Sequence, residues 1–365
     1  MASKARLSVA AVLGAGVLLT SLTACGEEEK SAAPTSSSVI SDERCAANGE
    51  AGKLTYLTSY QYAATASILD VLAAEELGYF DDLCLDVEVQ PGDTAQNPQL
   101  VSAGRAAFAA LGGPADVLSA VAAGADVVSV ATYGNVPAIE YISLADGPIK
   151  DLKDLEGKTV GYKGNQDPPL LSMLEKAGVD TDKVEFVSVG YDPSILAQGK
   201  VHALEAYKSN EPKVLAKAGH EVTEWKPEEY GVQSSFNNLV TSSKFAEKNP
   251  TAVEDFLRAT FKAYEWLSAS DENLTKGLGW AEKATGPGSY DVELAKVRWQ
   301  TEVELISSSQ PEGTPLGFQS EEQWKPEAEV YVEHGVLKEM PDLSEAFDAS
   351  YVEAIFEGTE LVWGE

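Results

Sequence analysis

The sequence predicts an α/β fold with two lobes, each built on a mainly parallel sheet with flanking helices, and extra C-terminal helices. Three observations predict it. Strand-like and helix-like segments alternate from residue 53 onward, which is typical of parallel sheets covered by helices. The alternation restarts after Tyr141, and the periodicity becomes helical after about Asn238. A chain of 365 residues is also long enough for two domains with separate cores.

The first half contains four predicted strands, at 53–60, 85–89, 106–111 and 127–132. The strand at 85–89 is the clearest, because apolar and polar residues alternate along it. Apolar residues at helical spacing predict a helix that Gly78 ends. Pro98 and Pro114 open two further helices, since proline suits the first helical turn.

The second half repeats this order. Strands are predicted at the end of 154–162 and at 184–189, with helices from Pro168 to Gly178 and at 194–197. The segment LVSAGRA at 100–106 resembles ILAQGKV at 195–201, which favours two lobes of like architecture; a chance match is the alternative. Four helices then follow, at 250–264, 272–283, 291–307 and 321–334. We therefore assign 53–140 plus 239–365 to lobe one and 141–238 to lobe two.

The first 24 residues have the features of an export signal. Lys4 and Arg6 precede an apolar stretch that is too short to span a bilayer. The following Leu-Thr-Ala-Cys resembles the bacterial lipoprotein signal, which implies that Cys25 is lipidated, as by palmitate, and becomes the mature first residue. An apolar helix of the fold is the alternative. Residues 25–52, charged and serine-rich at first, are predicted to be a flexible tether.

Two cysteines remain once Cys25 is set aside. Cys45 precedes the first predicted strand and Cys84 opens the second, and these strands could be neighbours. Disulfides persist outside the cytoplasm, so we predict a Cys45–Cys84 bond; two free thiols are the alternative.

The composition excludes some partners. A formal net charge of −31 argues against nucleic acid, which needs a basic surface, and against a polybasic membrane contact. Such acidity is typical of a soluble, monomeric exported protein, held at the membrane through its lipid alone.

Catalytic motifs are absent from the sequence. It contains no Gly-x-Ser-x-Gly, Walker, Gly-x-Gly-x-x-Gly or His-Glu-x-x-His pattern. The histidines, His202, His220 and His334, are widely spaced. We therefore expect no enzyme activity, no cofactor and no metal, although a triad assembled from distant residues remains an alternative.

Polar and aromatic residues gather where predicted strands end. In open α/β sheets, ligands bind outside the carboxyl ends of the strands. The loops at those ends are rich in Tyr, Asn and Gln, a composition typical of small-molecule sites. Ordinary loop polarity is the alternative for any single residue.

Three segments carry a family resemblance. EELGYF at 75–80, LVSAGRAAF at 100–108 and DLKDLEGKTVGY at 151–162 are similar to solute-binding proteins of ABC importers. They most resemble the branch for thiamine pyrimidine precursors and alkanesulfonates. The resemblance covers residues 53–355 and implies a type II periplasmic-binding-protein fold that closes on its ligand like a clamp. It also implies that the protein faces the extracytoplasmic side of the cell membrane and that its partners are the permease and ATPase subunits of an ABC importer.

The same resemblance suggests part of the site. In pyrimidine-precursor binders, a stretch of the pattern aromatic-Asn-x-Glu contacts the ligand. YKSNE at 207–211 occupies the equivalent place here, but it differs from that pattern in having a lysine after the tyrosine. The predicted ligand-binding residues are Tyr60, Gln61, Tyr62, Gly113, Glu140, Asn165, Tyr191, Tyr207, Asn210 and Glu211.

The ligand and the hinge follow from these assignments. None of the five arginines lies in a predicted cleft loop, so a neutral or amine-bearing heteroaromatic solute fits better than an anion. An anion such as an alkanesulfonate, held at the helix start near Pro168, is the alternative. A secreted enzyme and a sensor lipoprotein are the non-transport alternatives.

We expect the hinge between the two lobes at residues 140–143 and 237–241.

Overall fold

The computed structural model describes residues 37, 39–286 and 288–364. The predicted export signal, the lipidation site Cys25 and the first part of the tether lie outside the described residues. None of the described helices combines the length and the hydrophobicity that a membrane span requires.

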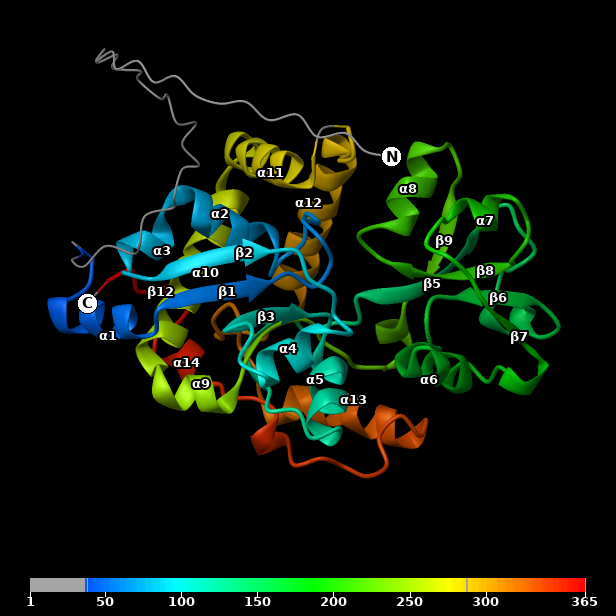
Figure 1. The fold of residues 1–365 in the computed structure, drawn as a ribbon. Coiled ribbons are helices and arrows are strands. Elements are labelled where there is room, and N and C mark those ends of the chain that lie inside the picture. Colours follow the sequence, from blue (N-terminus) through cyan, green and yellow to red (C-terminus); the bar gives the residue numbers. More distant parts are fainter. Residues whose placement is uncertain (1–36, 38, 287, 365) are drawn as a thin grey trace, which may run out of the picture. The chain divides into compact units, whose positions relative to one another are not determined.

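Two five-stranded sheets organise the described chain (Figure 1). The first sheet has the order β2 (Asp86–Gln90), β1 (Lys53–Leu57), β3 (Phe108–Leu111), β10 (Phe236–Thr241) and β4 (Val128–Gly134). The second has the order β7 (Glu185–Ser188), β6 (Thr159–Tyr162), β8 (Ala203–Tyr207), β5 (Ile139–Leu144) and β9 (Val222–Trp225). A small hairpin joins β11 (Phe356–Glu357) to β12 (Glu360–Leu361).

The sheets are mixed, whereas the sequence predicted mainly parallel ones. β1 runs parallel to β2 and β3, and β6 runs parallel to β7 and β8. However, β10 is antiparallel to β3 and β4, and β5 is antiparallel to β8 and β9. The difference has a simple cause: β5 and β10 follow the segments that cross between the sheets, so each enters its sheet from the opposite end.

Helices cover both faces of each sheet. Before β10 these are α1 (Asp42–Glu50), α2 (Leu69–Leu77), α3 (Tyr79–Asp82), α4 (Asn97–Ser102), α5 (Pro114–Ala122), α6 (Pro168–Lys176), α7 (Ser194–Ala197) and α8 (Glu211–Lys217). After β10 they are α9 (Ser243–Lys248), α10 (Pro250–Ala269), α11 (Asp271–Thr285), α12 (Val292–Ser309), α13 (Glu321–Glu333) and α14 (Ser350–Glu353). Short 3₁₀ turns occur at Leu152–Leu155, Thr181–Lys183, Pro227–Tyr230 and Leu343–Glu345.

Separate hydrophobic cores lie on the two faces of each sheet. Aromatic side chains of α10, notably Phe256 and Phe261, pack against one face of the first sheet, and Trp324 of α13 belongs to the core on the other. In the second sheet, Tyr141 packs with α6, while Ile142, the next residue of β5, faces the core beneath α7 and α8. This period-two alternation explains why each sheet carries helices on both sides.

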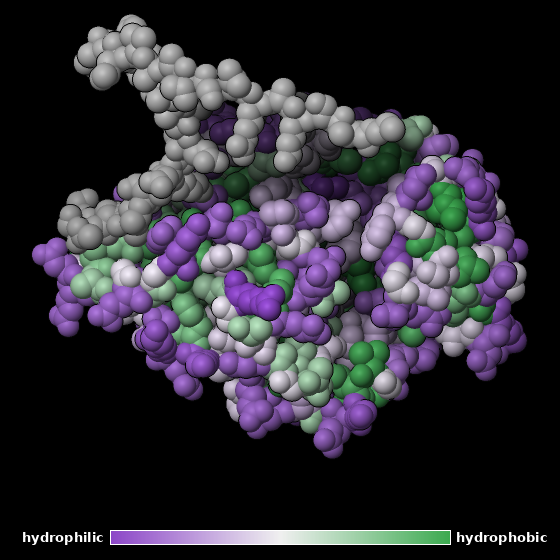
Figure 2. Space-filling view, in the orientation of Figure 1, coloured by the Kyte–Doolittle hydropathy of each residue, from purple (hydrophilic) through white to green (hydrophobic). Residues whose placement is uncertain are grey.

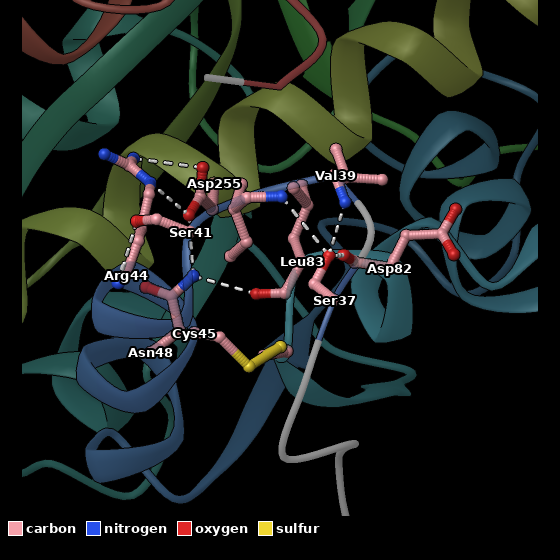
Figure 3. The surroundings of a disulfide bond; sticks show 11 residues. Ser37, Val39, Ser41, Arg44, Cys45, Asn48, Asp82, Leu83 and Asp255 are labelled. Atoms are coloured by element: carbon pink, nitrogen blue, oxygen red, sulfur yellow. Dashed lines mark hydrogen bonds and ion pairs between the residues drawn. A yellow bond between two sulfur atoms is a disulfide. The ribbon is translucent and has the colours of Figure 1, made fainter.

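Helix α1 corrects the predicted tether, because residues 42–50 are helical. The predicted disulfide is present: Cys45 of α1 bonds Cys84, with their Cα atoms 5.3 Å apart (Figure 3). Beside it, Arg44 Nε donates to Asp255 Oδ2 at 2.7 Å, and Asn48 Nδ2 donates to the same oxygen at 2.6 Å. The covalent bond and this buried ion pair explain why α1 is ordered against α10.

The chain passes between the sheets twice, through residues 135–138 and again through 231–235. The predicted hinge residues 140–143 and 237–241 lie within β5 and β10 instead, where strands pair with them on both sides. Paired backbone resists rotation, so these strands are poor places for a hinge.

Candidate functional site

Four carboxylates lie where two helices of the first sheet, α5 and α13, meet α6 and β8 of the second sheet. Asp116 Oδ2, in the first turn of α5, accepts from Gly112 N at 3.0 Å. Asp167 caps α6 by accepting from Leu170 N at 3.2 Å. Glu327 Oε2 of α13 accepts from Ser235 N at 3.0 Å, and Glu205 lies on β8. We call Asp116, Asp167, Glu205 and Glu327 the carboxylate cluster.

Burial raises the pKa of each of these four groups. It raises the pKa of Asp116 to about 6 and that of Asp167 to about 7, the latter helped by the charge of Asp116. It raises the pKa of Glu205 and of Glu327 to about 8, and in both cases Asp167 adds to the effect. Asp167 is thus the group that the other three share: the charge of Asp116 acts on it, and its own charge acts on Glu205 and Glu327.

Tyr207 reaches this cluster from the end of β8. Its side chain is 46% exposed, and a methyl group placed on Gly112, at the end of β3, would lie 4.0 Å from its hydroxyl. Desolvation raises the pKa of Tyr207, and nearby carboxylates, first Asp116 and Asp167, raise it further. The predicted site residue Tyr207 therefore lies between the two sheets.

Glu211 and Asn210 have internal partners. The Glu211 carboxylate forms a buried ion pair with Lys163, and its Oε2 accepts from Tyr207 N at 2.7 Å. The Asn210 side-chain oxygen accepts from Arg298 of α12. Both residues thus shape the loop that presents Tyr207. Sequence reasoning missed Lys163 and Arg298, which come from other elements.

Helix α12 connects the second sheet's loop to the first sheet. Glu302 is 4% exposed and accepts from Ser209 Oγ at 3.0 Å, from Asn237 Nδ2 at 2.8 Å and from Ala66 N at 3.4 Å. Ser209 follows β8, whereas Asn237 lies on β10. Burial raises the pKa of Glu302 to about 7. One carboxylate therefore couples the 207–211 loop to the loop after β1.

The predicted site residues of the first sheet differ in how exposed they are. Tyr60 is 61% exposed, next to Gln61, whose φ of 47° turns the chain. Tyr62 instead packs against the core beneath α10. Gly113 is buried against the backbone oxygen of Ser235, where an added Cβ would stand 2.7 Å away. Gly113 therefore permits a close approach of two backbones.

The remaining predicted residues are Asn165, Tyr191 and Glu140. Asn165 is exposed in the loop before α6, and Tyr191 is 70% exposed after the edge strand β7. Glu140 is fully buried in β5, and its carboxylate has no hydrogen-bond partner among the described residues. Burial raises its pKa to about 8, with Glu224 adding to the effect.

Some cluster members carried a signal in the sequence. Asp167 precedes Pro168-Pro169, which is a helix-start pattern, and so its capping position was readable. Glu327 lies in the middle of a polar helical segment and looks like a solvent-facing residue. The packing of α13 against α5 and α6 brings it to the cluster.

Two surface grooves are lined by helices and strands of the first sheet. One of about 690 Å³ is lined by first-sheet elements such as Val128, Glu247 and Phe347. Another of about 470 Å³ runs between α4 and α5, with Asp116 at its edge. Figure 2 shows a recess between the side chains of the first-sheet and second-sheet bodies. Within the described residues, no group of three or more His, Cys, Asp or Glu side chains is arranged to hold a metal ion.

Comparison with known proteins gives a consistent result. The family model described as NMT1/THI5 like matches residues 65–273, more than half of the chain. The chain is 31% identical over 259 residues to the formylaminopyrimidine-binding protein of Halalkalibacterium halodurans, covering 69% of this chain and 77% of that protein. It is 25% identical over 232 residues to the 4-amino-5-hydroxymethyl-2-methylpyrimidine phosphate synthase THI5 of Saccharomyces cerevisiae, covering 60% and 67%.

A solved structure shows the same fold. The periplasmic aliphatic sulphonate binding protein SsuA of Escherichia coli matches with a TM-score of 0.61 at 17% identity, covering 84% of this chain and 93% of that one. The predicted periplasmic-binding-protein fold is therefore confirmed. Together with the matched residues and the identity to the pyrimidine-binding relative, this places the chain in the NMT1/THI5-like family.

Proposed function

We propose that this chain is an extracytoplasmic solute-binding receptor of an ABC importer and that it captures an amine-bearing, pyrimidine-like heteroaromatic solute. Family membership supports a receptor, because the relative at 31% identity is named as a formylaminopyrimidine-binding protein. The observation that carries the ligand class is the carboxylate cluster, which presents four acidic groups from both sheets. Such a site favours a ligand that donates hydrogen bonds or carries positive charge.

An anionic solute fits this site less well. The start of α6 was the predicted anion position, but Asp167 already caps it. A second anion there would face the Asp167 charge and an N–H group that is already bonded. The sulphonate-binding fold relative is 17% identical and argues for the fold alone.

A panel of ligands tests the ligand class. Thermal unfolding should be followed with aminopyrimidines, alkanesulfonates, simple amines and flavins, each at the same concentration. A solute at a hundred times its dissociation constant should stabilise the protein by about 2.7 kcal/mol. We expect aminopyrimidines to raise the unfolding temperature. Stabilisation by alkanesulfonates alone would contradict the proposal.

Closure of two lobes is the proposed mechanism. Each sheet with its helices would form one lobe, with residues 135–138 and 231–235 as the hinge. A ligand that contacts both lobes favours the closed form through its differential affinity. Small-angle scattering should show compaction when the solute is added. A radius of gyration that stays the same with and without a tightly bound solute would argue against the clamp.

The enzyme alternative rests on the yeast relatives named as synthases. The receptor proposal predicts that a bound pyrimidine is recovered unchanged after prolonged incubation, with no new pyrimidine formed. Mass spectrometry of the protein and the solution measures both. Any turnover would favour the enzyme.

Anchoring through Cys25 is also part of the proposal, because Leu-Thr-Ala-Cys follows a charged and an apolar segment. The Cys25→Ala variant should lose its lipid label and either leave the membrane or remain unprocessed. A Cys45→Ser variant serves as the control and should keep the label. Lipid labelling that survives Cys25→Ala would refute the anchor.

A further inference from the structure

Two residues on neighbouring strands of the second sheet each carry a buried polar atom that has no hydrogen-bond partner among the described residues. Glu205 of β8 is directly opposite Tyr141 of β5 in the antiparallel register, so both side chains lie on the same face. Glu205 is 7% exposed and Tyr141 is fully buried. Within the described residues, neither Glu205 Oε2 nor Tyr141 Oη has a hydrogen-bond partner. Leaving such groups unpaired is costly, so their juxtaposition points to a partner that is supplied from outside the chain.

The surroundings define what that partner must be. Besides burial, the charges of Asp167, the N-cap of α6, and of Glu211, the first residue of α8, raise the pKa of Glu205. The charge of Lys163, after β6, and a hydrogen bond from its backbone lower it. Lys163 is bonded to Glu211. Tyr207 lies on the same face of β8, two residues further along, and senses Asp116 across the gap. Negative charge therefore prevails around Glu205, and a donor or a cation would be accepted there.

The protonation state of Glu205 determines which hydrogen bonds it can make. Burial and the charge of Asp167 raise the pKa of Glu205 to about 8, against the opposing charge of Lys163. At neutral pH the carboxyl group thus keeps its proton and offers an O–H donor beside a C=O acceptor. The edge formed by an amino group and the adjacent ring nitrogen of an aminopyrimidine offers the complementary acceptor and donor. The proton can also move to the ring, where the resulting cation faces Asp167.

Resting on the proposed function, we infer that Glu205 is a specificity-determining residue that binds the amino edge of the pyrimidine, flanked by Tyr141 Oη and Asp167. Tyr207, two residues beyond Glu205 on the same face of β8, is 46% exposed, so solvent reaches this face of the strand. A pyrimidine without the amino group would keep its ring contacts and lose the donor that Glu205 accepts from.

The test compares two ligands and four proteins by titration calorimetry. The ligands are 4-amino-5-hydroxymethyl-2-methylpyrimidine and the same pyrimidine without its 4-amino group. The proteins are the full parent chain, Glu205→Leu, Glu205→Gln and the control Glu221→Leu, which changes an exposed glutamate of the same lobe. Losing the two hydrogen bonds of the protonated carboxyl group should weaken binding roughly 10- to 100-fold.

We expect the parent and Glu221→Leu to prefer the amino ligand by at least roughly tenfold. Glu205→Leu should lose that preference while its unfolding temperature stays equal or rises, since it removes a buried carboxyl group. A residue with a structural role alone would lower stability and binding together. The affinity of the parent should fall between pH 7 and 9, because Glu205 loses its proton there. Glu205→Gln keeps a donor and an acceptor at every pH, so it should bind at pH 7 and show no such fall.

The outcomes distinguish the role of Glu205 from the receptor function of the chain. If the parent binds the amino ligand but Glu205→Leu binds it equally well, the role of Glu205 is overturned and the receptor proposal stands. If the parent binds both ligands alike, the role of Glu205 is again overturned, even where Glu205→Leu fails to fold. If the parent binds no pyrimidine at all, both proposals fail.

Discussion

Two groups of buried carboxylates in this chain have opposite environments. Beside α1, fully buried Asp255 accepts hydrogen bonds from Arg44, Asn48 and Arg258, so its charge is compensated within the protein. In the carboxylate cluster, Glu205 and Glu327 are nearly as buried, and their neighbours include further acids. The comparison teaches that a compensated carboxylate stabilises the fold, whereas crowded carboxylates take up protons and can accept a ligand.

Removing the disulfide should have the largest effect, because it lies in the compensated region. The Cys45→Ser/Cys84→Ser double variant releases a constraint between positions 39 residues apart. Loss of that restriction on the unfolded chain should cost about 4 kcal/mol of unfolding free energy, measured by urea denaturation. Solute affinity should stay unchanged. A loss below about 1 kcal/mol would show that the fold hardly depends on this bond.

Breaking the ion pair should follow. Arg44→Ala leaves the buried Asp255 with less compensation, and the free energy of unfolding should fall by about 3 kcal/mol. The matched control is Arg105→Ala, which removes an exposed arginine of the same lobe and should change stability by less than about 0.5 kcal/mol. Equal effects of the two variants would mean that compensation at Asp255 is unimportant.

The pH dependence of stability should report the cluster. The pKa of Glu205 and that of Glu327 are about 8 in the folded state, against an ordinary 4.5. Between these values the unfolded chain has released protons that the folded chain keeps, so raising the pH favours unfolding. The unfolding temperature should therefore fall from pH 5 to pH 8. The Glu205→Gln/Glu327→Gln variant should show a flatter profile, and an unchanged slope would argue against protonated acids in the cluster.

The smallest effect is expected at the link between the sheets. Ser209→Ala removes the hydrogen bond to Glu302, and a neutral hydrogen bond contributes about 1 kcal/mol. This should shift the balance between open and closed forms of the free protein roughly fivefold towards open, measured by scattering or by distances between spin labels. Thr301→Ala is the control, because it removes a hydrogen bond within α12, from Thr301 Oγ1 to Val297 O, and no contact between the sheets. A balance that both variants leave unchanged would remove Glu302 from the mechanism.

Much of the fold was readable because it depends on local chemistry. The alternation along 85–89 predicts β2, and the proline pair at 168 with Gly178 brackets α6. The two cysteines that remain once Cys25 is set aside, after a predicted export signal, predict the Cys45–Cys84 bond that the structure contains. These signals arise from side-chain periodicity, backbone restriction and counting, which act within a few residues or do not depend on geometry.

The tertiary structure alone decided the strand directions of β5 and β10, the helix at 42–50 and the partners of the charged residues. Glu211 pairs with Lys163, 48 positions away, and Glu327 joins Asp167 through the packing of α13 on α6. Charge attraction has no sequence period, so many pairings are equally compatible with the residues. Which carboxylate is compensated and which stays available depends on the side chains that packing brings within a few ångströms.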